Sequence, residues 1–211
     1  MPGHPVATAL PIEPPAAVTG LILAGGRGSR FGGLDKGLLE LAGQPLIQHI
    51  AGRLAGQVAT LRLSANRHVE RYRALGFEPL GDGAYHDAGP LAGLRAGLAA
   101  CATPWLLAVP CDMPLLPHDL CTRLWRAAGP DDLRARVPFD GQRHHYACLL
   151  VPRSALVPVT AALDAGRHSV RDLLAEIGWL GVNFAACNAH AFCNVNTPAD
   201  LAGLAHAVEA P

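Results

Sequence analysis

The sequence predicts an α/β fold, a three-layer sandwich in which helices cover both faces of a mostly parallel sheet. Apolar runs of strand length alternate with amphipathic segments of helix length, the order expected when crossover helices join parallel strands. The chain has 211 residues and half of them are apolar, which is enough for one substantial core. We therefore expect a single domain over residues 18–208.

Residues 1–17 are expected to form a disordered extension. They contain five prolines and show neither helical nor strand periodicity. They also lack the charged start and the continuous apolar stretch of a secretion signal. No run in the sequence approaches the roughly 20 apolar residues that span a bilayer. These features predict a cytoplasmic protein.

Seven strands and four helices account for the apolar pattern. Strands are expected at residues 20–24, 60–65, 77–80, 105–109, 134–138, 146–151 and 181–184. Helices are expected at 45–57, 90–101 and 118–128, the first beginning at Pro45, which suits a first helical turn. A last helix should begin after Thr197, because Asp200 follows three positions later and completes a capping pattern.

In an open parallel sheet, ligands bind beyond the carboxyl ends of the strands. Three motifs follow expected strands: a glycine-rich loop after residues 20–24, the turn 81–83 around Asp82, and the segment 110–112, which ends in Asp112. We expect them to meet at one edge. The pair Asp140-Gly141 predicts a hairpin-like excursion over residues 137–146, which could form a wall for a second substrate.

The glycine-rich loop is a candidate phosphate-binding site. Residues 25–37 contain six glycines, two arginines and one lysine. Backbone N–H groups of Ala24, Gly25 and Gly26 can meet the base and phosphates of a nucleotide. Arg30 and Lys36 supply positive charge where negative charge develops in phosphoryl transfer. The alternative is a surface turn with solvated cations. The loop fits neither the dinucleotide fingerprint nor the Walker loop.

Asp112 is the candidate metal ligand. It follows a buried apolar run and lies between Pro110 and Pro114, which restrict the backbone. Magnesium takes only one or two protein carboxylates when phosphates supply other ligands, so one aspartate is sufficient and Mg²⁺ is the expected cofactor. The alternative is that Asp112 caps a helix beginning near Pro117.

Two further groups are candidates for contacting a second substrate. Asn194 and Asn196 flank one extended residue, so their side chains should point the same way, toward a phosphate or a ring. They could instead be turn-forming asparagines before a capped helix. His144 and His145 follow Arg143 in the predicted excursion and could contact an anion, although loop histidines are often merely exposed.

Charge and cysteine patterns exclude other classes of protein. Lysine plus arginine equals aspartate plus glutamate at 17 each, which argues against a nucleic-acid or membrane-surface binder. The six cysteines form no CxxC pair and no zinc-like spacing, so free thiols that are mostly buried are expected.

Four motifs together carry a resemblance to a known family. Residues 23–39 read LAGGRGSRFGGLDKGLL, and GPLAG (89–93), PCDMP (110–114) and NVNTP (194–198) follow. This set resembles the molybdenum cofactor guanylyltransferases, which belong to the nucleotide-diphospho-sugar transferase-like nucleotidyltransferases. The resemblance runs from about Thr19 to His206. It implies a Rossmann-like sandwich of the nucleotide-diphospho-sugar transferase fold.

The resemblance also implies site residues and partners. The positions that match the family's guanine-nucleotide site are Leu23, Ala24, Gly25, Lys36, Asp82 and Asp112, with Asp112 also binding magnesium. Gly26 belongs to the same loop, and Gly89 and Gly93 lie in a segment that is near the nucleotide in the family. Ser64 stands where close relatives have asparagine, and Asn66 is the candidate replacement. Asn194, Asn196 and His145 are the candidates for binding molybdopterin.

The implied activity is transfer of GMP from Mg-GTP to the terminal phosphate of molybdenum-molybdopterin, with release of pyrophosphate. Proteins that deliver molybdopterin or mature molybdoenzymes are possible partners, and a monomer is expected. The alternatives are a cytidylyltransferase acting on the same cofactor, a sugar-phosphate nucleotidyltransferase, or a regulatory protein that binds nucleotide without catalysis. Gly25 favours the guanylyl version, because cytidylyl relatives tend to have alanine there.

Overall fold

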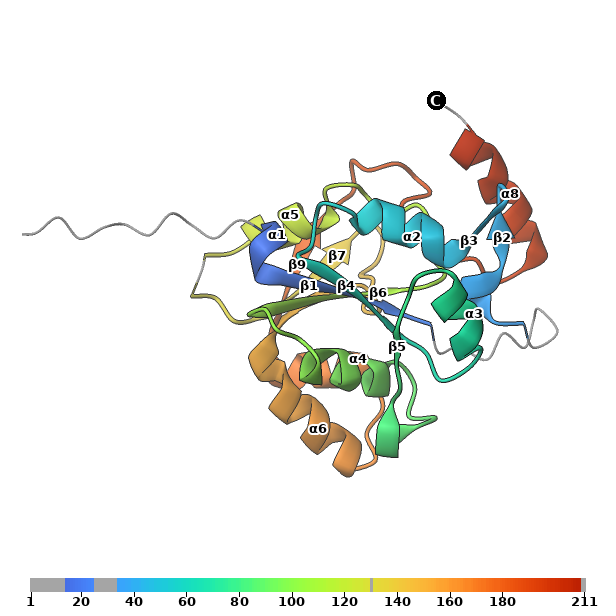
Figure 1. Cartoon of the computed structure of the whole chain (residues 1–211). Coiled ribbons are helices and arrows are strands. Elements are labelled where there is room, and N and C mark those ends of the chain that lie inside the picture. The colour runs from blue at the N-terminus through green and yellow to red at the C-terminus, as the bar shows by residue number, and fades with distance from the viewer. Residues whose placement is uncertain (1–13, 25–33, 130, 210–211) are drawn as a thin grey trace, which may run out of the picture.

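The structure is a computed structural model that describes residues 14–24, 34–129 and 131–209. Within these residues a seven-stranded sheet lies between two layers of helices, which confirms the predicted fold class (Figure 1). The strand order is β5-β4-β1-β6-β8-β7-β9. The strands are β1 Val18–Leu23, β4 Thr60–Ser64, β5 Pro79–Leu80, β6 Trp105–Pro110, β7 Ala135–Phe139, β8 Leu149–Pro152 and β9 Trp179–Asn183. Each expected strand is present with shifted ends.

Strand direction decides which loops share an edge. β1 runs parallel to both β4 and β6, and Leu23 at its end pairs with Ser64 and Pro110. β8 is antiparallel to β6 and β7, and its first residue, Leu149, pairs with Ala108 near the end of β6. The residues that lead into β8 therefore arrive at the same edge as the residues that leave β1, β4 and β6.

The helices differ in part from those expected. They are α1 Pro14–Ala17, α2 Leu46–Leu54, α3 Val69–Ala74, α4 Pro90–Ala99, α5 Leu120–Arg126, α6 Leu156–Asp164, α7 Val170–Ile177 and α8 Pro198–Glu209. Short 3-10 turns occur at Lys36–Leu38, Gly83–Tyr85 and Arg153–Ala155. The expected helices correspond to α2, α4, α5 and α8. The structure adds α1, α3, α6, α7 and a small hairpin of β2 Glu40–Leu41 with β3 Gln44–Pro45.

Each face of the sheet has its own apolar core. Successive strand residues alternate between the cores: Ile22 and Leu107 pack with α2 and α5, whereas Leu21 and Leu106 pack with α4, α6 and α7. Figure 1 shows α2 and α5 on one side of the sheet and α4 and α6 on the other. A third, smaller cluster joins α8 to β2 through Leu41, Val195 and Leu204. This cluster holds the start of α8 near the end of β6.

The last four residues of the 1–17 segment, which the sequence predicts to be disordered, form a helix. Pro14–Ala17 forms helix α1, and the Ala17 side chain is buried against the sheet. Residues 1–13 lie outside the described residues, so the division at residue 17 stays a prediction apart from this helix. The six cysteines are free, and four of them are buried. No helix in the described ranges has the length and apolar character needed to cross a membrane.

Candidate active site

The site lies where β1, β4, β5 and β6 end. The Ala24 N–H donates to the carbonyl of Ser64 at 2.8 Å, and the Cys111 N–H donates to that of Leu23 at 3.0 Å. The segment that follows β1 thus starts between β4 and the residue before Asp112. The predicted contacts at Gly25, Gly26 and Arg30 lie outside the described residues. The described chain resumes at Leu34.

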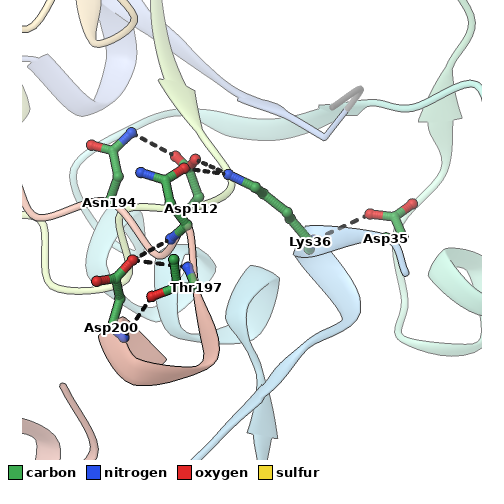
Figure 2. Close-up of polar contacts among 8 residues, drawn as sticks. Asp35, Lys36, Asp112, Asn194, Thr197 and Asp200 are labelled. Carbon is green, nitrogen blue, oxygen red and sulfur yellow. Dashed lines mark hydrogen bonds and ion pairs between the residues drawn. The ribbon is translucent and has the colours of Figure 1, made fainter. Parts of the chain in front are cut away.

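Lys36 and Asp112 are in direct contact. The Nζ atom of Lys36 lies 2.9 Å from Oδ2 of Asp112 and 2.7 Å from Oδ1 of Asn196 (Figure 2). The Lys36 and Asp112 side chains are 18% and 14% exposed, so the pair is partly shielded from solvent. Three segments far apart in the sequence meet here. Helix α5 begins only at Leu120, so Asp112 is not its cap.

The backbone around Lys36 is held by a buried hydroxyl. Asp35 Oδ1 accepts hydrogen bonds from the Gly37 N–H at 3.1 Å and from the Tyr72 hydroxyl at 2.6 Å. Burial, together with the bond to Asp35, raises the pKa of Tyr72 well above its usual range. A Cβ atom at Gly37 would lie 2.5 Å from the Tyr72 oxygen, so glycine is required for this approach. The Lys36 side chain extends from this fixed backbone to Asp112 and Asn196.

Asp112 is flanked by the segment before α8. The Val195 N–H donates to the Asp112 carbonyl at 2.8 Å, and Nδ2 of Asn194 lies 3.4 Å from Asp112 Oδ1. Asn194 points to Asp112 (Figure 2). Asn196 contacts Lys36, so both asparagines face the Lys36–Asp112 pair, as their alternating spacing predicts. The two asparagines therefore border the same charged pair.

A capping box fixes Asn196. Asp200 Oδ2 accepts from the N–H groups of Asn196 and Thr197, both at 2.8 Å, and the Asp200 N–H donates to Thr197 Oγ1 at 3.2 Å. These are the reciprocal bonds of a helix start, as the sequence predicts. The hydrogen bond from the backbone N–H of Asn196 is the main cause of the lowered pKa of Asp200. The start of α8 thereby fixes the backbone of the residue that contacts Lys36.

Asp82, Asn66 and Ser64 form a second polar group at the ends of β4 and β5. Nδ2 of Asn66 donates to Asp82 Oδ2 at 2.6 Å, and the Asp82 N–H donates to Asn66 Oδ1 at 2.9 Å. Ser64 Oγ donates to Asp82 Oδ1 at 3.2 Å. Asp82 is 7% exposed, whereas Asn66 is exposed. Asn66 is therefore the member of this group that faces solvent.

The two glycines beside α4 have different surroundings. Gly89 is exposed at the cap position of α4, with φ 73° and ψ −157°, a conformation that favours glycine. A Cβ atom at Gly93 would lie 2.6 Å from Ser64 Oγ and 2.8 Å from Leu23 Cδ2. Gly93 thus allows α4 to pack closely on β1 and β4, which accounts for the glycine without a ligand. A nucleotide contact at either glycine stays a prediction.

A cavity of about 710 Å³ opens beside the asparagines. It brings together the three residues predicted to bind a second substrate, Asn194, Asn196 and His145. Arg143 and His190 also line it, together with residues from the start of α8. The Lys36–Asp112 pair therefore lies next to a cavity through the shared residues Asn194 and Asn196.

The predicted turn at Asp140 shapes this cavity. Asp140 Oδ1 accepts from the N–H groups of Gln142 and Arg143, both at 2.8 Å, and Oδ2 lies 2.7 Å from Nε2 of His145. Burial opposes ionisation of Asp140, but these hydrogen bonds prevail and lower its pKa to about 2. His145 is 5% exposed and its ring stacks on Phe192 at 4.6 Å, so the interpretation of His145 as an exposed loop residue is wrong. Burial lowers the pKa of His145 despite the Asp140 carboxylate.

The donor atoms at Asp112 fit a magnesium ion that also binds phosphates. The described residues contain no group of three or more His, Cys, Asp or Glu side chains arranged for a metal ion. A site completed by phosphate and water oxygens needs only one or two carboxylates. The Lys36 ammonium, a cation, already lies between the oxygens of Asp112 and Asn196. Asp112 with Asn196 would therefore hold Mg²⁺.

The profile of one family, described as the MobA-like NTP transferase domain, matches residues 20–180. The chain belongs to this family. The transferase is 43% identical over 189 residues to a molybdenum cofactor guanylyltransferase from Cupriavidus taiwanensis, covering 87% of this chain and 94% of the relative. A protein of the same name from Yersinia pseudotuberculosis is 39% identical over 183 residues, covering 87% and 92%.

Solved structures agree on the fold of the transferase. Molybdopterin-guanine dinucleotide biosynthesis protein A from Archaeoglobus fulgidus superposes with a TM-score of 0.75 at 19% identity, covering 90% of this chain and 98% of that one. A CMP:2-keto-3-deoxy-manno-octonic acid synthetase complexed with CTP gives a TM-score of 0.71 at 17% identity, covering 91% and 98%. The nucleotide-diphospho-sugar transferase fold is thus confirmed.

Proposed function

We propose that this transferase moves GMP from Mg-GTP to the terminal phosphate of molybdenum-molybdopterin, forming the guanine dinucleotide cofactor and pyrophosphate. The observation that carries the proposal is the Lys36–Asp112–Asn196 cluster, which joins the glycine loop, the end of β6 and the wall of a cavity. Curated relatives with this activity in their name match 87% of the chain. A nucleotide site and an adjoining cavity are what a two-substrate transferase requires.

The reaction is an in-line displacement at the α-phosphorus of GTP. An oxygen of the acceptor phosphate forms the new P–O bond while the bond to pyrophosphate breaks. The acceptor is already anionic, so no strong protein base is needed. Lys36 and Arg30 neutralise charge on the α-phosphate and the departing pyrophosphate. Magnesium held by Asp112 and Asn196 would supply further neutralisation of the phosphates.

The GTP site comprises the end of β1 and its neighbours. Leu23 ends β1 at this site and Ala24 follows it, and because the Ala24 N–H already donates to the Ser64 carbonyl, the backbone N–H groups for the nucleotide would come from Gly25 and Gly26. Lys36 and Asp112 would face the triphosphate. Asn66 bonds Asp82 through both its amide nitrogen and its amide oxygen. Its second N–H and second lone pair would give the base the paired donor and acceptor that Ser64 lacks. The segment 89–93 borders the same edge of the sheet.

The acceptor enters the 710 Å³ cavity. Asn194 and Asn196 would contact its phosphate beside Lys36, and His145, which lines the same cavity, would support its ring system. The names of the relatives favour this acceptor over a sugar phosphate and favour GTP over CTP. A cytoplasmic location, a monomeric state and contacts with proteins that deliver molybdopterin or mature molybdoenzymes stay predictions.

Nucleotide selectivity tests the proposal. Purified protein with Mg²⁺ and molybdenum-molybdopterin is incubated in turn with GTP, ATP, CTP and UTP, and pyrophosphate release is measured. We expect release only with GTP. Equal turnover with CTP would contradict the guanylyl assignment, and no turnover with any nucleotide would favour a regulatory protein.

Replacing Lys36 tests its role as a charge-stabilising group. Lys36→Ala should reduce turnover by at least ~100-fold, the scale of losing one preorganised group that stabilises the transition state. Arg167→Ala is the matched control, because Arg167 is an exposed cation that pairs with Glu176 on the surface. The control should keep normal turnover. Near-normal turnover of Lys36→Ala would remove Lys36 from the mechanism.

A further inference from the structure

We propose that Lys36 blocks the metal site in the absence of nucleotide. Its ammonium occupies the position that a divalent ion would take, and the ion replaces the ammonium only when it binds together with nucleotide. The inference rests on the proposed function, because it assigns Asp112 to the metal and the triphosphate to Lys36. It adds an order of events. Free metal ions are excluded from Asp112, and a metal–nucleotide complex is admitted.

The contacts of Lys36 place two cations in competition. Its Nζ atom lies 2.9 Å from Asp112 Oδ2 and 2.7 Å from Asn196 Oδ1, two of the three oxygens that these residues offer to a metal ion. The third, Asp112 Oδ1, lies 3.4 Å from Nδ2 of Asn194. A magnesium ion lies about 2.0–2.1 Å from each oxygen ligand. An ion on Asp112 Oδ2 and the ammonium on the same atom would repel strongly, because partly buried charges are weakly screened. One of the two cations has to leave.

The structure allows the Lys36 ammonium to leave without disturbing its backbone. Asp35, Gly37 and Tyr72 hold the chain on both sides of Lys36 through two hydrogen bonds. The flexible four-carbon stem of a lysine can swing from that fixed point. A triphosphate offers the displaced ammonium new anionic oxygens, whereas a free metal ion offers none. The nucleotide therefore makes the exchange favourable, and metal and nucleotide strengthen each other's binding.

Lys36 can be observed alone, because it is the single lysine among the 211 residues. Protein grown with ¹³C-lysine gives one Cε resonance from the folded chain, and this resonance reports on the surroundings of the ammonium. We expect it to keep its position when Mg²⁺ is added alone. It should shift when Mg²⁺ and a non-hydrolysable GTP analogue are added together. A shift with millimolar Mg²⁺ alone, equal to that with the analogue, would overturn the proposal.

Metal affinity without nucleotide gives the second test, read from the paramagnetic resonance signal of free Mn²⁺. Lys36→Met should bind Mn²⁺ at least ~10-fold more tightly than the natural chain, within the usual range of coupling between sites. Lys36→Arg keeps the charge and should bind Mn²⁺ as weakly as the natural chain. Circular dichroism establishes that each variant is folded.

Two outcomes would overturn the inference. Lys36→Met could bind Mn²⁺ no more tightly than the natural chain, or the double variant Lys36→Met/Asp112→Asn could keep the tight binding, which would place the metal elsewhere. Both outcomes are compatible with normal GTP turnover by the natural chain, so the proposed function would survive. Loss of the function would instead appear as absent turnover in the natural chain.

Discussion

Side-chain contacts of Asp35 hold the backbone on both sides of Lys36 and so position its ammonium. Tyr72 is fully buried in helix α3, and its hydroxyl reaches Asp35 at 2.6 Å. Gly37 packs on the same hydroxyl, where a Cβ atom would approach to 2.5 Å. Asp35 and Gly37 therefore act as one unit on either side of Lys36, and the geometry of the charged pair depends on residues outside the pair itself.

Gly37→Ala should damage both stability and turnover. The added methyl group overlaps the Tyr72 oxygen, so either the Asp35–Tyr72 bond or the backbone at Lys36 has to shift. We expect a loss of about 1–3 kcal/mol in the free energy of unfolding, the usual cost of overpacking a buried site. Turnover should fall because Lys36 moves away from Asp112. Chemical denaturation and pyrophosphate release measure the two effects.

Gly52→Ala is the matched control for this substitution. Gly52 lies in α2, and a Cβ atom there would meet nothing within 4 Å. Alanine in a helix interior should raise the free energy of unfolding by about 0.5–1 kcal/mol and leave turnover unchanged. If Gly37→Ala left turnover unchanged and did not lower the free energy of unfolding, as expected for Gly52→Ala, the close packing of Gly37 on Tyr72 would not contribute to function.

The sequence predicts the charged residues of the site better than their supports. Lys36 and Asp112 are found because a glycine-rich loop and a strand-end aspartate are local patterns with a known chemistry. The bond between Asp35 and Tyr72 joins residues with no shared pattern, so only tertiary packing reveals it. His145 illustrates the same limit: a loop position suggests exposure, whereas stacking on Phe192 buries it.

At the scale of elements, local signals explain which helices can be anticipated. Helix α8 follows its capping pattern. Helix α7 has the same kind of sequence signal at both ends: Ser169 accepts from the Asp172 N–H at its start, and Gly178 follows its end with φ 80°. The sequence does not predict α6, because Pro158 within the segment normally indicates the end of a helix. That proline lies in the first turn, where backbone N–H groups have no helical partner, so the helix tolerates it. α3 follows His68 in a left-handed conformation and has no side-chain cap.

The start of α8 should affect catalysis as well as stability. Thr197→Ala removes the oxygen that accepts from the Asp200 N–H, and a lost cap costs about 1 kcal/mol in the free energy of unfolding. Because Asn196 precedes this residue and contacts Lys36, turnover should also fall. The control is Ser169→Ala, which removes the equivalent cap of α7.

The two cap variants separate structure from function. They should lose similar stability in thermal melts, while only Thr197→Ala loses pyrophosphate release. Equal turnover in the two variants would show that the cap of α8 stabilises the fold without positioning Asn196.

At the scale of the whole molecule, the two cores depend on the same strands. Neighbouring residues of β1 and β6 alternate between them, so neither core can open without removing support from the other. The sequence predicts this sandwich because continuous apolar runs, without alternating polar residues, are typical of strands covered on both faces. It does not predict the direction of β8, because an apolar run is the same whichever way the strand points.

The shared strands predict one cooperative unfolding transition. Trp105 and Trp125 report on one core, and Trp179 packs against the other. In Trp179→Phe, fluorescence reports on the first core alone, whereas circular dichroism reports on all helices. We expect the two denaturation curves to coincide in this variant and in the natural chain. Separate midpoints would mean that the two layers unfold independently.

The reversed direction of β8 has a consequence for how acceptors can change over evolution. Segment 140–148 enters this strand from the edge where β1, β4 and β6 end, so its length and composition can vary while the loops after those three strands stay as they are. Under the proposed function, changes in this segment would alter the acceptor cavity around His145 without changing the loops proposed to bind the donor. A descendant with a new acceptor would rebuild the stretch that precedes Leu149 and would have to keep it matched to Asn194 and Asn196, which line the same cavity from the segment before α8.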